Sequence, residues 1–212
     1  MRRPGAIRSR AILFALALGA VATTSAARAT PQNDVRDLSV GEAVTDLPKA
    51  GYAGFACAAE PKLSLSDWQD WRKCPADRSG LHTIRFGYDP STDPEGTKVA
   101  GHPVILELMV GEDARVDGLR ITTDPKTRLY LRKKAFLLGI QAKARYGDEG
   151  WDCQQGSPNA DEQPIGGVYV KEQCKKTLDG RQVLIERNLY AKPGSDLKDF
   201  IGETRITILR AP

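Results

Sequence analysis

The sequence has little of the residue chemistry on which most metal and nucleophilic sites depend. Only two histidines are present, His82 and His102, and no two of the four cysteines are separated by just two residues. The close Cys and His pairs of zinc sites, thiol-exchange motifs and covalent haem sites are therefore missing. There is also no glycine-rich phosphate-binding loop. The sequence thus predicts no cofactor and no metal.

Long hydrophobic runs are also scarce, and the one present lies at the N-terminus. Residues 1–10 carry four arginines, residues 11–25 are apolar or small, and Ala27-Arg28-Ala29 forms a small-x-small pattern. This order is typical of a secretory signal peptide. The run is shorter than the roughly 20 residues that span a bilayer. We therefore expect residues 1–29 to be a cleavable signal peptide, which leaves a periplasmic or secreted protein without an integral membrane segment.

Positive charge is scarce once the expected signal peptide is removed. The full chain has a net charge of +4, but residues 1–29 hold five arginines and no acidic residue, which leaves −1 for residues 30–212. Binding to a phosphate backbone or to an anionic surface usually requires clustered positive charge. The net charge thus argues against a nucleic-acid partner and against an electrostatically held membrane partner.

The four cysteines all follow the expected signal peptide, in a compartment where thiols are normally oxidised. Three pairings are possible. We expect Cys57–Cys74 and Cys153–Cys174, because each pair closes a short loop, and a loop of about 20 residues contributes on the order of 3 kcal/mol.

The remaining pattern predicts an α+β fold. Residues 30–36 form a short polar leader, and residues 37–212 suit a single domain. Alternating apolar segments, such as residues 81–89 and 103–110, predict an antiparallel sheet of about five to seven strands. Two disulfides are expected to staple it.

One major amphipathic helix is expected at about residues 125–145. Asp124 is a suitable N-cap, Pro125 suits the first helical position, and Gly147 suits the position after the helix. The residues at helical spacing that should face the sheet are Leu131, Ala135, Leu138 and Ala142.

The segment 147–164 is rich in acidic residues, namely Asp148, Glu149, Asp152, Asp161 and Glu162. A common calcium loop needs ligands at alternating positions and a final bidentate Glu, and this segment supplies neither. We expect a polar surface loop closed by Cys153–Cys174, with Gly166-Gly167 forming a turn or bulge at the start of a strand.

The candidate catalytic residues form no complete set. Ser79 and His82 are too close in sequence for a triad whose members come from separate elements. Ser195-Asp-Leu-Lys198 matches the Ser-x-x-Lys motif, but the companion motifs of the penicillin-recognising enzymes are absent. No catalytic residue is therefore assigned.

Trp68, Trp71 and Trp151 lie inside or beside the cysteine loops. We expect them to cover the disulfides as part of the core, and the alternative is an exposed binding patch made of these three residues.

These observations favour a small exported protein that acts as a binding or interaction module in the cell envelope. Its partner would be an envelope protein or a small ligand. One alternative is a cell-envelope hydrolase that uses acidic residues of the 147–164 loop, and another is a divalent-cation-binding protein that uses the same loop.

Processing of the N-terminus is the first testable consequence. Protein recovered from the envelope should begin at or near Thr30, because Ala27-Arg28-Ala29 is the well-placed cleavage pattern after the apolar run. N-terminal sequencing gives the readout, and an intact Met1 on exported protein would contradict the expectation.

Overall fold

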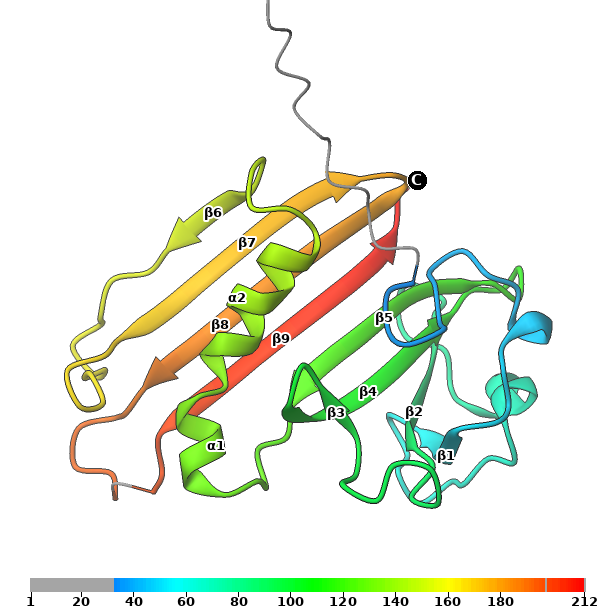
Figure 1. Ribbon diagram of the computed structural model, residues 1–212, viewed down its shortest axis with the longest axis horizontal. Coiled ribbons are helices and arrows are strands. Elements are labelled where there is room, and N and C mark those ends of the chain that lie inside the picture. Colours follow the sequence, from blue (N-terminus) through cyan, green and yellow to red (C-terminus); the bar gives the residue numbers. More distant parts are fainter. Residues whose placement is uncertain (1–32, 197, 212) are drawn as a thin grey trace, which may run out of the picture.

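A nine-stranded antiparallel sheet extends across the part of the chain that this computed structural model describes, residues 33–196 and 198–211 (Figure 1). Its strand order is β1-β2-β4-β5-β9-β8-β7-β6, and β3 pairs with β4 outside this path. The strands are β1 Tyr52–Cys57, β2 His82–Tyr88, β3 Lys98–Val99, β4 His102–Val110, β5 Val116–Thr123, β6 Asp152–Gln155, β7 Val170–Leu178, β8 Arg181–Tyr190 and β9 Ile201–Arg210. The expected signal peptide lies outside the described residues.

The antiparallel sheet is confirmed, but the expected number of five to seven strands is wrong. The two additional strands are β3 and β6. β3 has only two residues, and all four residues of β6 are exposed at an edge of the sheet. Neither strand therefore shows the alternation of buried and exposed residues by which a strand is found in a sequence.

The sheet consists of two halves that meet at β5 and β9. One half runs β1-β2-β4-β5 and the other β6-β7-β8-β9, so in each half the chain proceeds from an outer edge towards the centre. The register shows which residues share a face, because directly paired residues point to the same side. One such row of mutually paired, buried residues crosses both halves: Leu106, Ile121, Ile206, Ile185 and Cys174.

The opposite face of the sheet is polar. Its neighbouring row contains Glu107, Arg120, Thr207, Leu184 and Lys175, and Arg120 donates to Glu107 over 3.0 Å. The alternation along each strand thus gives one apolar face that needs a cover and one face that water can solvate.

Within the described residues, four helical segments cover the apolar face or its margins. They are η1 Val44–Asp46 and η2 Trp68–Lys73, which are 3-10 helices, and the α-helices α1 Leu129–Lys133 and α2 Phe136–Arg145. α2 packs on β8 and β9 (Figure 1). No helix of the described residues is long and apolar enough to span a membrane.

The expected helix at about 125–145 is wrong at its start and in its continuity. Asp124 accepts the Lys126 amide in a turn, and helical structure begins only at Leu129. The helix then breaks between α1 and α2, where the Thr204 hydroxyl of β9 donates to the Ala135 carbonyl over 2.8 Å. The end is as expected, because Gly147 follows α2 with a φ of +87°, a conformation that favours glycine.

The predicted inner face of the helix is confirmed for Ala135, Leu138 and Ala142, which are buried, while Leu131 is half-buried. Gly139 lets α2 approach the sheet, since a Cβ there would lie only 2.3 Å from the Arg187 Cδ atom.

Two aliphatic residues on α2 test this packing. Leu138→Ala should lower the free energy of unfolding by about 2–4 kcal/mol, because a buried side chain is lost and a cavity remains. Ile140→Ala, on the solvent side of the same helix, should cost under about 0.5 kcal/mol. Equal losses in denaturant melts would contradict the assigned face.

Candidate binding pocket

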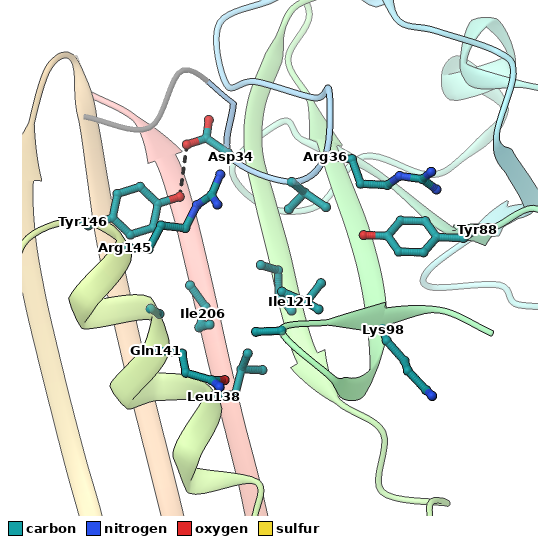
Figure 2. Close-up of a pocket in the computed structure, with 14 residues that line it drawn as sticks. Asp34, Arg36, Tyr88, Lys98, Ile121, Leu138, Gln141, Arg145, Tyr146 and Ile206 are labelled. Atoms are coloured by element: carbon teal, nitrogen blue, oxygen red, sulfur yellow. Dashed lines mark hydrogen bonds between the residues drawn. The ribbon is translucent and has the colours of Figure 1, made fainter. Parts of the chain in front are cut away.

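A pocket of about 400 Å³ lies on the helix-covered face, above the line where β5 meets β9 (Figure 2). α2 forms one wall, and the N-terminal residues 34–36 with the β3–β4 hairpin form the other. The lining residues are Asp34, Val35, Arg36, Tyr88, Lys98, Val99, Ala100, Ile121, Leu138, Gln141, Ala142, Arg145, Tyr146 and Ile206. We call this space the seam pocket.

The floor of the seam pocket is apolar. Ile121 of β5 and Ile206 of β9 are direct partners in the sheet register and point to the same face. Leu138 and Ala142 of α2 line the pocket beside them. α2 lies over β8 and β9, so the pocket lies beside the helix at the β5–β9 junction, and its floor residues Ile121 and Ile206 are themselves buried.

One end of the pocket is polar and fully hydrogen-bonded. The buried Asp34 carboxylate accepts from Arg181 Nε over 3.0 Å, the Tyr146 hydroxyl over 3.1 Å and the Val40 amide over 2.9 Å. Burial and the Asp34 charge raise the pKa of Tyr146, so its phenol stays neutral. This network joins the N-terminal segment to α2 and β8, and leaves Asp34 no free role as a base.

Three cationic side chains line the pocket, and they differ in whether a carboxylate already pairs with them. Arg36 lies over the Tyr88 ring at 4.4 Å and pairs with Asp93 at 3.0 Å. Lys98 pairs with Glu95, and both Arg36 and Lys98 extend away from the floor (Figure 2). Arg145 is exposed and donates to the Asn33 carbonyl, and it has no carboxylate partner among the described residues. Of the three cations, Arg145 is therefore the one whose charge no described carboxylate offsets.

The lining of the pocket is suited to binding rather than to nucleophilic catalysis. Among the described residues that line it, none is a serine, threonine, cysteine or histidine. The one carboxylate, Asp34, is held by Arg181 and Tyr146. A nucleophile next to an oriented base, which acyl transfer requires, is not assembled in this lining.

The three tryptophans do not form an exposed patch. Trp68 is fully buried in a cluster with Phe55 and Phe86, at ring distances of 4.6 and 4.8 Å, and Trp71 is buried beside His82. Trp151 is half-buried, and its indole N–H donates to the Gly147 carbonyl. The alternative of an exposed patch made of all three residues is therefore wrong, because Trp68 and Trp71 lie in the core.

The candidate catalytic residues are likewise held in structural contacts. His82 Nδ1 lies 2.6 Å from the Cys74 carbonyl oxygen. Burial lowers the pKa of His102, whose ring contacts Gln141. Ser195 donates to the Lys192 carbonyl, while the Lys198 ammonium lies 3.5 Å from Asp196. The structure brings none of these residues together as a catalytic pair.

The expected pairing of the cysteines, Cys57–Cys74 and Cys153–Cys174, is confirmed. Gly166 and Gly167 form the expected turn, both with positive φ. The expected polar surface loop contains a short exposed strand near its start, because residues 152–155 form β6 and pair with β7.

The acidic residues of the loop do not converge on one point. Glu162 accepts from Lys171 and from the Tyr169 hydroxyl, each over 2.7 Å, and these contacts lower its pKa to about 2. In the described chain, one group of side chains is close enough together to bind a metal ion, namely Cys153, Glu172 and Cys174. Its two sulfurs are bonded to each other in the disulfide. This geometry supports neither the hydrolase nor the cation site.

Comparisons with protein-family models, with curated proteins and with solved structures find no match for this chain. The seam pocket is therefore interpreted from its own geometry.

Sequence reasoning missed the seam pocket. Leu138 and Ala142 belong to the face that helical spacing predicts, but that spacing also fits a fully covered core. The other wall comes from residues 34–36 and from the two-residue strand β3, which carry no recognisable signal in the sequence.

The disulfide of the acidic loop yields a test. Replacing Cys153 and Cys174 by serine should lower the free energy of unfolding by roughly 2–4 kcal/mol, because the unfolded chain regains the freedom of the closed loop. Proteolytic nicking should then begin within residues 157–161, beyond the paired residues of β6.

A second measurement tests for a bound cation by adding EDTA to the wild-type protein. Its melting temperature should stay unchanged, because Glu162 and Asp152 of the loop are paired with Lys171 and Lys175 and do not converge on one point. A melting temperature lowered by EDTA would restore the interpretation as a cation site.

Proposed function

We propose that the protein is an exported binding module of the cell envelope, and that the seam pocket takes up a small, largely apolar molecule with an acidic group. The observation that carries the proposal is the pocket itself. Its volume of about 400 Å³ is within the range usual for ligand sites, and its floor is made of aliphatic side chains.

The acidic group is inferred from Arg145. Its guanidinium lies at the pocket beside Tyr146 and is not neutralised by a described carboxylate. A carboxylate, sulfate or sulfonate could accept a charge-assisted hydrogen bond from it. Asp34 does not cancel this preference, because its charge is already satisfied by Arg181.

The location in the envelope rests on the N-terminal pattern and on the cysteines. Two disulfides are compatible with an oxidising compartment. The basic and apolar residues 1–29 favour export into such a compartment.

A fluorescent amphiphilic anion, 1-anilinonaphthalene-8-sulfonate, tests the pocket directly. It should bind to the mature protein at one saturable site. Ala142→Leu fills part of the pocket and should weaken binding by at least about tenfold, because the new side chain occupies the volume of the ligand. Ala144→Leu, on the exposed side of the same helix, should bind as the wild type does.

A second variant tests whether the loss of binding in Ala142→Leu reflects filling of the pocket and not a change in the packing of α2. Val99→Phe narrows the pocket from the opposite wall and should also weaken binding. Thermal melts should show that all three variants are folded. Equal affinity of the wild type, Ala142→Leu and Val99→Phe would refute the seam pocket as the binding site.

A further inference from the structure

The helical region carries the strongest local charge of the chain. From Pro125 to Gly147 the sequence has no acidic residue and seven basic ones: Lys126, Arg128, Arg132, Lys133, Lys134, Lys143 and Arg145. The net charge of −1 for residues 30–212 conceals this concentration, because acidic residues elsewhere in the chain offset it. An argument from net charge alone therefore misses a basic surface.

Four of these cations are available to a partner. Lys143 pairs with Glu172 at 3.0 Å, Arg132 donates to the carbonyls of Lys198 and Phe200, and Arg145 donates to the carbonyl of Asn33. The others are exposed and form no ion pair within the described residues, namely Lys126, Arg128, Lys133 and Lys134. The adjacent β8–β9 connection adds no net charge, since its Lys192 and Lys198 offset its Asp196 and Asp199.

Exposed apolar side chains coincide with these charges. Leu129 and Tyr130 on α1 are 46% and 65% exposed, and Ile140 on α2 is 47% exposed. Val168 is the remaining large hydrophobic residue that the described chain exposes. It follows the Gly166–Gly167 turn, where a Cβ on Gly166 would lie 3.2 Å from the Lys133 ammonium. The exposed large hydrophobics of the described chain thus all lie on or beside the basic helices.

The helices present this surface outward. α1 and α2 lie as one layer on the sheet, and α1 is at the lower margin of the molecule in Figure 1. Their inner side is occupied by buried residues such as Leu138, while Tyr130, Lys133 and Ile140 remain on the solvent side. Among the described residues nothing covers this outer side.

We propose that the outer side of α1 and α2 docks on an anionic phospholipid membrane. Positive side chains would contact the headgroups, while Leu129, Tyr130 and Ile140 enter the interface between headgroups and acyl chains. The Tyr130 hydroxyl and ring both contact the Lys134 ammonium, which gives an amphipathic pair with an apolar body and a charged end. A purely acidic protein would match the charges but would leave the apolar side chains without a role.

Vesicle sedimentation tests the proposal with the mature protein. It should bind vesicles of equal parts phosphatidylglycerol and phosphatidylcholine, should not bind phosphatidylcholine vesicles, and should dissociate as salt is raised. Lys133→Gln with Lys134→Gln should lower the partition coefficient by roughly 25-fold, at about fivefold for each charge. Leu129→Ser with Tyr130→Ser should also weaken binding several-fold.

The matched control removes two exposed cations from the other half of the molecule. Lys62→Gln with Arg78→Gln, in the connections between β1 and β2, should leave vesicle binding unchanged. The pocket variant Ala142→Leu should bind vesicles like the wild type, so the docking surface and the seam pocket can fail independently. Melting temperatures should confirm that each variant is folded.

Three results would overturn the proposal. One is equal binding to both kinds of vesicle, and another is an equal loss in the control variant and in Lys133→Gln with Lys134→Gln. The third is tight binding to soluble polyglutamate together with vesicle binding that Leu129→Ser with Tyr130→Ser does not weaken. That result would assign the surface to an acidic protein partner instead.

Discussion

The pairing of β5 with β9 is the contact on which the rest of the structure depends. It joins the two halves of the sheet, and each half is built from strands that follow one another in the chain, apart from the short β3. The paired residues run from Gly118–Leu209 to Thr122–Arg205. A shift of one residue between β5 and β9 would place Ile121 and Ile206 on opposite faces of the sheet, so the alternation of side chains fixes the register strongly. The same pairing places two isoleucines at the base of the seam pocket.

Two disulfides and the contacts of the buried Asp34 stabilise the two halves around this junction. Cys57 ties β1 to the end of η2, and Cys153 ties β6 to β7, so each disulfide secures the outermost strand of its half. The buried Asp34 connects the N-terminal segment to Arg181 of β8 and to Tyr146 after α2. The contacts of Asp34 therefore join the two walls of the seam pocket at one end and fix their relative position.

The sequence predicts those features that have a periodic or local chemical signal. Seven strands follow from alternation, the inner face of α2 follows from the spacing of Leu138 and Ala142, and Gly147 follows from the need for a positive φ. The features without such a signal were missed. The exposed β6 depends on its pairing with β7. The helix starts at Leu129 without a side-chain cap, while Asp124 accepts the Lys126 amide in the preceding turn. The pocket arises only when distant segments meet, which no local pattern encodes.

The central claim is that the seam pocket, above the β5–β9 junction, is the ligand site. Methyl NMR during titration with 1-anilinonaphthalene-8-sulfonate tests it most directly. The account predicts that the methyl signals of Ile121, Leu138 and Ile206 shift in a saturable manner, while Leu184, on the opposite face of the sheet, stays unchanged. Shifts at Leu184 with none at Ile121 and Ile206 would contradict the account.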